Sequence, residues 1–252
     1  MKSTRIAMLL LCSAHMVWSA EQPKPAKKVA EAKAEGITRE QADAILSELK
    51  TIRQLLEKQA AANPAPPGPR ATKLKLSPGD KVLGRMDAPV TMVEFTDYQC
   101  GFCRAFHFNT FPQLKRDFID TGKVRFISRD LPLDFHANAL RAAQAARCAG
   151  DQNKFWEMRE VMIANASKLG EDDLNGYAGQ LGINVPAFQA CLSSRKYESD
   201  VRSETAQATL LNIDGTPSFL IGKSTLDGVE GEIMVGALPV AAFEKRLREL
   251  ER

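Results

Sequence analysis

Two cysteines separated by two residues stand where a strand pattern changes into a helical one. The run VTMVEF, residues 90–95, predicts a buried strand, and residues 103–120 predict a helix. At such a junction the first thiol lies beside unpaired backbone N–H groups at the positive end of the helix dipole, which favours its thiolate. The spacing therefore predicts that Cys100 is a redox nucleophile and that Cys103 resolves the mixed disulfide it forms.

Two other uses of this cysteine pair fit the sequence less well. A structural zinc site needs two more ligands at short spacing, whereas Cys148 and Cys191 stand alone. An inert disulfide between Cys100 and Cys103 would close a very small loop and so stabilise little. We therefore expect a reactive pair, with no metal and no other cofactor.

The first twenty residues resemble a cleavable secretory signal. Lys2 and Arg5 precede an apolar stretch, residues 6–18, which is too short to span a bilayer and ends in small residues. We expect a signal peptide over residues 1–20 and a periplasmic or otherwise exported protein that is soluble after cleavage. Lipid attachment at Cys12 is the alternative.

Charge and cysteine content agree with export. Two of the 34 Lys and Arg residues lie in the signal, which leaves 32 against 31 Asp and Glu. This near balance does not favour a nucleic-acid partner. Four cysteines follow the signal, in a compartment where disulfides persist. We therefore expect a second, structural bridge between Cys148 and Cys191.

The segment before the main domain has three parts. Residues 21–36 are rich in Ala, Lys, Glu and Pro and predict a disordered linker. Residues 37–60 predict an amphipathic helix that begins at a capping box of Thr38 and Gln41. Residues 61–73 form a Pro-rich linker.

The helix has an apolar face with the spacing of a coiled-coil seam. This face is made of Ile45, Leu49, Ile52 and Leu56, flanked by Leu46 and Leu55. A helix that packs on its own domain is the alternative, but the Pro-rich linker favours separation from it. We expect residues 37–60 to assemble a homo-oligomer, from dimer to tetramer.

Residues 74–252 alternate strand and helix signals in the order of a single α/β domain. A second strand is predicted at residues 124–128, and a right-handed parallel crossover would join it to the first. A helical tract at about 136–211 follows. Strand patterns return at 215–222 and 232–236 before a closing helix. Phe95, Phe111 and Phe118 are expected in the core.

Residues 76–252 resemble the DsbA-like group of thioredoxin-fold thiol-disulfide oxidoreductases of the bacterial cell envelope. The resemblance rests on EFTDYQCGFC, on GTPSF and on the helical insertion. It implies a thioredoxin fold and a cis-proline loop at Thr216 and Pro217, whose extended backbone would pair with a substrate strand. Pro217 as an ordinary strand start is the alternative.

An acidic residue beneath the active site is a further feature of that family, and Glu94 matches it. Burial of a carboxylate in an apolar run should raise its pKa, which suits it to carry the proton of Cys103. The alternative is a solvent-facing strand position. His107, one turn after Cys103, is given no role by the resemblance and is expected on the surface.

The two residues between the cysteines are Gly101 and Phe102, without the histidine of strongly oxidising members. This difference implies a milder potential. The Cys-Gly-aromatic-Cys form, with a separate assembly segment, also resembles the periplasmic disulfide isomerases. We expect Phe102 at an exposed rim where it contacts clients.

The sequence as a whole predicts an exported enzyme that forms or isomerises disulfides in client proteins and is recycled by a membrane redox partner. Two alternatives stay open. One is an oligomeric chaperone or holdase with a vestigial motif. The other is a thiol reductase dedicated to one partner, because oxidase, isomerase and reductase share these residues.

Overall fold

The computed structural model describes residues 37–62 and 72–252. The signal peptide predicted for residues 1–20, the linker predicted for 21–36 and most of the Pro-rich linker lie outside this part of the chain. Within it, no helix has the length and apolarity needed to cross a bilayer. The chain divides into an N-terminal unit and a larger unit that contains the cysteine pair.

The N-terminal unit contains one helix, α1 (Arg39–Ala62). Its predicted capping box is confirmed, since Thr38 Oγ1 accepts from the Gln41 backbone and the Gln41 side chain accepts from the Thr38 backbone, at 3.2 and 3.0 Å. The exposed apolar side chains of this helix are Ile45, Leu46, Leu49, Ile52 and Leu55. The helix therefore presents an unpaired apolar face, called here the α1 face.

The larger unit is built on a six-stranded mixed sheet with the strand order β1-β6-β5-β3-β4-β2. The strands are β1 (Thr72–Lys75), β2 (Lys81–Leu83), β3 (Val90–Thr96), β4 (Val124–Asp130), β5 (Ser218–Ser224) and β6 (Gly228–Val235). Strands β3 and β4 are parallel, as predicted, and the other pairs are antiparallel. The short edge strands β1 and β2 were not predicted.

The helices fall into three groups along the chain. Between β3 and β4 lie α2 (Gly101–Asn109), α3 (Phe111–Leu114) and a π-helical turn (Lys115–Ile119). Between β4 and β5 lie α4 (Ala139–Gly150), α5 (Phe155–Ala164), α6 (Glu171–Gln180), α7 (Val185–Ser193) and α8 (Glu198–Leu210); α9 (Val240–Leu250) closes the chain. Pro112 lies in the first turn of α3, so the predicted helix is interrupted there.

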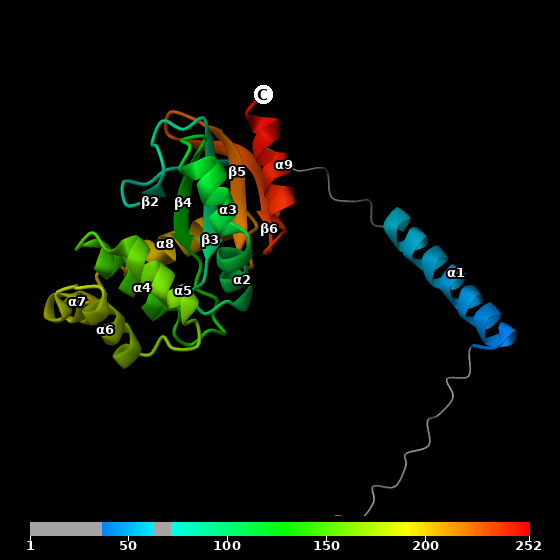
Figure 1. Ribbon diagram of the computed structural model, residues 1–252, viewed down its shortest axis with the longest axis horizontal. Helices are drawn as coiled ribbons and strands as arrows, with labels where there is room; N and C mark the ends of the chain where they lie inside the picture. The colour runs from blue at the N-terminus through cyan, green and yellow to red at the C-terminus, as the bar shows by residue number, and fades with distance from the viewer. Residues whose placement is uncertain (1–36, 63–71) are drawn as a thin grey trace, which may run out of the picture. The chain divides into compact units, whose positions relative to one another are not determined.

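The two faces of the sheet carry different helices. Helices α2, α3 and α9 cover one face and α8 lies against the other (Figure 1). Side chains alternate along β3, so Val90 and Met92 join the first core while Val93 and Phe95 join the second. By the same alternation Glu94 points to the face covered by α2. Phe95, Phe111 and Phe118 are buried as predicted.

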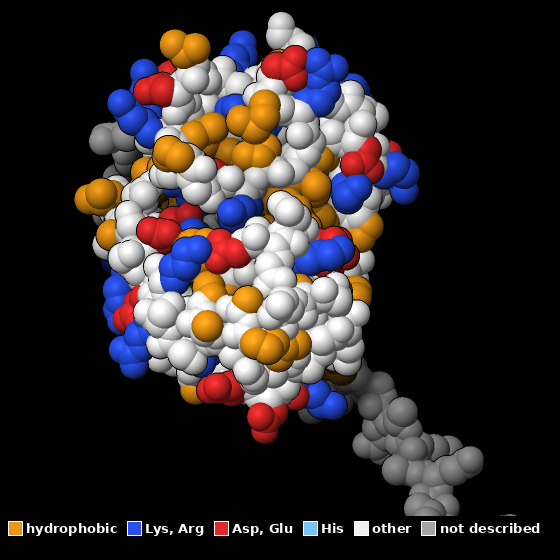
Figure 2. Space-filling view, turned by 90° about the vertical axis from the view of Figure 1, so that its left-hand side faces the viewer, with side chains coloured by type: hydrophobic (Ala, Val, Ile, Leu, Met, Phe, Trp, Pro, Cys, Tyr) orange, Lys and Arg blue, Asp and Glu red, His pale blue; other side chains and the backbone are white. Residues whose placement is uncertain are grey.

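Helices α4 to α7 form most of a third core, rich in alanine, to which Tyr98 and Val201 of α8 also contribute. The side of the domain with β2, α6 and α7 faces the viewer in Figure 2, where cationic and anionic side chains are interspersed. This face has no large field of one sign.

A buried ion cluster fastens this insertion to the sheet. Arg147 of α4 donates to Asp130 of β4 at 2.7 Å and to Glu204 of α8 at 2.5 Å. Glu204 also accepts from the Asp130 backbone N–H at 2.7 Å. Burial, and then the neighbouring Asp130, raise the pKa of Glu204 to about 7, and burial raises that of Asp130 too. Two carboxyl groups therefore share one guanidinium in the interior.

Candidate active site

Cys100 occupies the N-cap of α2. Its backbone is extended (φ −70°, ψ 121°), and its side chain makes no capping bond to the helix. The Cys100 thiol donates instead to the backbone carbonyl of Thr216, with a sulfur–oxygen distance of 3.4 Å. The residue is 5% exposed. The first thiol of the motif therefore lies at the positive end of the helix and against the loop that begins β5.

Hydrogen bonds hold the Cys100 sulfur in its anionic form. The thiol of Cys103 is the largest influence, and together with Thr216 and the backbone of Phe102 it lowers the pKa of Cys100 from 9.0 to about 5, against the opposing effect of burial. At neutral pH the reduced protein thus carries a thiolate at Cys100.

Cys103, one turn further into α2, has the opposite environment. Its side chain is fully buried, with 0% exposure. Burial raises its pKa well above the ordinary value, and the neighbouring Cys100 and the charge of Glu94 add to the rise. Both cysteines are free thiols in the structure. The pKa values of the two thiols are therefore shifted in opposite directions.

Glu94 lies on β3 in a buried cluster with His107 of α2 and Arg159 of α5, called here the Glu94 cluster. The His107 Nε2 atom is 2.9 and 3.1 Å from the two Glu94 oxygens. Arg159 donates to the same carboxylate and, through Nε, to Ser128 at 3.0 Å. A solvent-facing Glu94 is thus excluded, since its side chain is fully buried.

Two expectations about this cluster are wrong. Burial alone raises the pKa of Glu94, as the sequence suggested, but the hydrogen-bonded His107 and the guanidinium of Arg159 more than offset it, so the pKa lies below its ordinary value. His107 is also not a surface residue, because its side chain is 7% exposed. Burial and the adjacent Arg159 lower the pKa of His107, which favours the neutral ring.

Sequence reasoning missed Arg159 altogether. A signal was present, since Arg159 lies on the same helical stripe as the buried Phe155, Met158 and Met162. A cation on an apolar stripe requires a buried anion. His107 carried a similar signal, because it lies four residues after Cys103 and hence on the buried face of α2.

The loop before β5 completes the site. The Thr216–Pro217 peptide bond is cis. Ser218 follows as the partner of Phe95 in the sheet, so the loop adjoins the end of β3 from which the cysteine motif begins. The Thr216 hydroxyl is buried and has no hydrogen-bond partner among the described residues.

A groove of about 610 Å³ runs past the reactive sulfur, and it is called here the front groove. Its walls include Cys100, Gly101, Phe102, Leu133, Phe135 and Thr216. Phe102 is 70% exposed at the rim, as predicted, and Phe135 is also exposed. A side chain added at Gly101 would meet no atom within 4 Å. The groove therefore presents an aromatic rim and uncovered backbone beside the thiolate.

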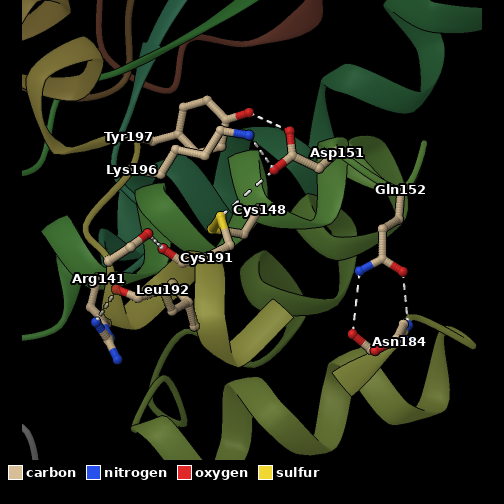
Figure 3. Close-up of a disulfide and its surroundings, with 10 residues drawn as sticks. Arg141, Cys148, Asp151, Gln152, Asn184, Cys191, Leu192, Lys196 and Tyr197 are labelled. Carbon is tan, nitrogen blue, oxygen red and sulfur yellow. Dashed lines mark hydrogen bonds and ion pairs between the residues drawn. A yellow bond between two sulfur atoms is a disulfide. The ribbon is translucent and has the colours of Figure 1, made fainter. Parts of the chain in front are cut away.

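The remaining two cysteines lie apart from this site. Cys148 and Cys191 form a disulfide that joins α4 to α7, with their Cα atoms 5.8 Å apart (Figure 3). Asp151 beside the bridge accepts from Lys196 at 2.8 Å and from the Tyr197 hydroxyl. The expected pairing of Cys148 with Cys191 agrees with this bridge, which holds the insertion together without touching Cys100.

The chain was compared with known proteins. A family model described as thioredoxin matches residues 76–235, more than half of the chain. The chain belongs to the thioredoxin family. Within it, the relatives and solved structures below support the DsbA-like group that the motifs suggested.

Among curated proteins, a putative protein-disulfide oxidoreductase of Rickettsia bellii is 30% identical over 181 residues, which cover 69% of this chain and 67% of that protein. Disulfide bond formation protein D of Bacillus subtilis is 29% identical over 59% of this chain and 70% of that one. The Na(+)/H(+) antiporter NhaA 1 of Salinispora arenicola is 34% identical over 67% of this chain. The chain spans only 26% of that antiporter.

Two solved structures have the same fold. The α-DsbA1 protein of Wolbachia pipientis has a TM-score of 0.60 at 27% identity, over 70% of this chain and 93% of that one. Oxidised BdbD of Bacillus subtilis has a TM-score of 0.60 at 25% identity, over 72% of this chain and 99% of that one. The thioredoxin fold with a helical insertion is therefore established for this chain.

Proposed function

We propose that the protein is an exported thiol-disulfide oxidoreductase that forms or isomerises disulfides in client proteins. The observation that carries the proposal is the placement of the two thiols, with Cys100 at the N-cap of α2, where its pKa is lowered, and Cys103 buried behind it, where its pKa is raised. A thiolate attacks disulfides, whereas a protonated thiol is unreactive until a base accepts its proton. The disulfide oxidoreductases among its relatives support the same reaction class.

In the oxidising direction, a client thiolate attacks Cys100 of the Cys100–Cys103 disulfide. The bond between the two cysteines breaks, a mixed disulfide forms at Cys100, and Cys103 leaves with the electron pair and takes up a proton. A second client thiolate then attacks the client sulfur of the mixed disulfide. The client gains a disulfide, and Cys100 leaves as the thiolate that its hydrogen bonds stabilise.

In the isomerising direction, the Cys100 thiolate attacks a wrong disulfide in the client and releases one client sulfur as a thiolate. That thiolate can attack another disulfide of the same client, which rearranges the pairing without net oxidation. If rearrangement stalls, Cys103 attacks Cys100 and releases the client in reduced form. Cys103 then loses the proton that Glu94 is proposed to accept.

Client binding is proposed for the front groove. The backbone of Thr216 lies in the loop that enters β5, beside the front groove, where an extended client segment would pair with it. Gly101 leaves room for that segment to approach, and the Phe102 ring supplies an apolar contact. The clients are thus cysteine-bearing segments that are unfolded or extended.

Assembly and recycling extend the proposal. The α1 face is exposed over residues 45–55, and a second copy of α1 would cover it. A homo-oligomer of two to four copies would bring several reactive pairs around one client, as an isomerase requires. An exported protein of this class also needs a membrane redox partner that restores its disulfide or its thiols.

The experiment is the reactivation of a scrambled multi-disulfide protein, together with the oxidation of a reduced dithiol peptide. Wild type, Cys100→Ala and Cys148→Ala/Cys191→Ala are compared. We expect Cys100→Ala to lose both activities and the double variant to retain them when it folds. Retention of activity by Cys100→Ala would instead identify a chaperone or holdase.

A shortened protein that begins at Ala71 distinguishes isomerase activity from oxidase activity. If the full chain reactivates the scrambled protein and the shortened chain does not, the α1 segment is required for isomerisation. If both oxidise the peptide and neither reactivates the scrambled protein, the activity is that of an oxidase.

A further inference from the structure

A second groove, called here the rear groove, opens between α2–α3 and α5. Its volume is about 460 Å³, and its apolar walls are formed by Leu83, Phe108, Phe111, Pro112, Trp156 and Ile163. His107 and Arg159 also line it. Among the described residues, none lines both this groove and the front groove. The Glu94 cluster is therefore reached from a surface other than the one that carries Cys100.

The buried position of Cys103 creates a need for a proton route. Its side chain is fully buried, and it must lose or gain a proton each time the disulfide is formed or broken. Its neighbour Cys100 is engaged with the client at that moment. A proton that left through the front groove would have to pass the bound client.

We propose that the proton of Cys103 travels through Glu94 and His107 and leaves the protein by the rear groove. This inference rests on the proposed redox function and adds an outlet to it. Glu94 faces Cys103 on one side, and His107 Nε2 is within hydrogen-bond distance of both carboxylate oxygens on the other. The charge of Glu94 acts on the Cys103 thiol, and the His107 ring lines the wall of the rear groove.

Release of the client from the mixed disulfide moves one electron pair and one proton. Cys103 attacks Cys100, the bond between Cys100 and the client sulfur breaks, and the client leaves with the electron pair as a thiolate. The Cys103 proton passes to Glu94, from Glu94 to Nε2 of His107, and from the ring to water in the rear groove. When a client thiolate opens the disulfide in the oxidising direction, a proton enters by the same route in reverse.

The charges around the cluster disfavour a proton that stays on Glu94 or His107. Arg159 is held against Glu94 and touches His107 Nε2 at 2.7 Å, so an added proton is disfavoured on both groups. The pKa values of Glu94 and His107 are accordingly both below their ordinary values. Lys115 from the π-helical turn and Glu160 from α5 are the other charged residues of the groove wall. Arg159 is thus a positioning residue.

Dithiobis(nitrobenzoate) tests the route, because it reports the two sulfur steps separately. Attack by Cys100 releases one coloured thiolate, and attack by Cys103 on the mixed disulfide releases a second. We compare wild type with His107→Gln, which keeps a donor to Glu94 and cannot relay a proton. Lys115→Gln is the matched control, since Lys115 lines the groove and its ion-pair partner is Asp120.

In wild type we expect a second phase that is nearly independent of pH from about pH 6 to about pH 9, because an internal group accepts the proton. In His107→Gln we expect an unchanged first phase and a second phase slowed about tenfold or more, which then rises about tenfold per pH unit as hydroxide replaces the relay. Lys115→Gln should match wild type in both phases.

The result that overturns the outlet is a second phase in His107→Gln with the rate and pH dependence of wild type. A wild-type second phase that rises about tenfold per pH unit would also overturn the outlet, whether or not His107→Gln folds, because it means direct deprotonation of Cys103. Absence of the first phase in folded wild type contradicts the proposed redox function instead, so the two failures are distinguishable.

Discussion

The Cys100 thiol and the Thr216 carbonyl are joined by a hydrogen bond of 3.4 Å between residues that are 116 positions apart in the sequence. The contact brings the start of α2 against the loop before β5. It also brings the Thr216 hydroxyl near a sulfur that is anionic at neutral pH, and Thr216 contributes to the low pKa of Cys100.

Replacement of Thr216 by valine should raise the pKa of Cys100, because the shape is kept while the hydroxyl, which has no other partner in the described part of the chain and lowers the pKa of the thiol, is lost. We expect a rise on the order of one pKa unit, and a smaller thiolate fraction at acidic pH. The pH dependence of ultraviolet thiolate absorbance measures it. Thr110→Val is the control, because Thr110 is a buried threonine bonded to Leu238. An unchanged pKa in Thr216→Val would show that the hydroxyl is not a donor.

The stability of the reduced protein should depend on pH through Cys100. Its pKa is lower in the folded state than in the unfolded chain, so its stabilising contribution is fully present above pH 9.0 and is lost as the pH falls through about 5. Denaturant unfolding of reduced wild type and reduced Cys100→Ser measures this contribution. The difference between the two proteins should grow as the pH is raised. A difference that stays constant would argue against a stabilised thiolate.

The same thiolate bears on the reduction potential. A pKa of about 5 lies between the values of about 7 and about 3.5 found for thioredoxin and DsbA, so we expect a potential between about −270 and −120 mV. Equilibration with glutathione buffers measures it. A potential as high as that of DsbA would contradict the milder oxidant expected from Gly101 and Phe102.

Loss of Arg159 should leave the Glu94 carboxylate buried without its cation. We expect Arg159→Met to lower the free energy of unfolding by about 3 to 5 kcal/mol at neutral pH. In the double variant Glu94→Gln/Arg159→Met most of that loss should be recovered, since the uncompensated charge is gone. Denaturant titrations of both single variants and the double variant complete the cycle. Additive losses would mean that the pair is not coupled.

The cluster of Asp130, Arg147 and Glu204 should produce the opposite pH dependence. The pKa of Glu204 is higher in the folded protein, at about 7, than its ordinary 4.5, so its contribution is fully present below pH 4.5 and lost as the pH rises through about 7. The change is on the order of 3 kcal/mol. Glu204→Gln should remove this pH dependence, which unfolding at a series of pH values measures. The α8 residue Glu198, which is half-buried and paired with Arg202, is changed to Gln as the control.

The α1 face predicts that assembly is lost when charges are placed on it. The double variant Ile45→Glu/Ile52→Glu should sediment as a single copy, because buried charges at coiled-coil core positions cost more than the assembly gains. Lys50→Glu, a change elsewhere on the same helix, should leave the mass of the assembly unchanged. A wild-type protein that sediments as one copy would contradict the proposed assembly.

Local patterns were enough to predict the order of strands and helices around the cysteine pair. Strand β3, helix α2 and the parallel β4 each have the apolar spacing of their type, and the cysteines stand at the boundary between two of them. The edge strands β1 and β2, four and three residues long, were too short to show a period.

The electrostatics of the site could not be predicted in this way. The sequence correctly marked Glu94 as a buried carboxylate but gave the wrong direction for its pKa, because the groups that lower it, His107 of α2 and Arg159 of α5, lie 13 and 65 positions away. The depressed pKa of Cys100 likewise depends on Thr216 across the fold. Charges that meet through tertiary structure leave only indirect signals, such as a cation on an apolar stripe.

Arg159 belongs to the helical insertion, whereas Glu94 belongs to the central strand of the sheet. Without the insertion, the buried Glu94 carboxylate in the thioredoxin core of this protein would therefore lack the cation Arg159. An exchange of insertions between relatives would exchange the counter-ion of the buried acid along with the helices. Variation in this one helical segment could thus alter the chemistry of Cys103 while every residue of the cysteine motif stays the same.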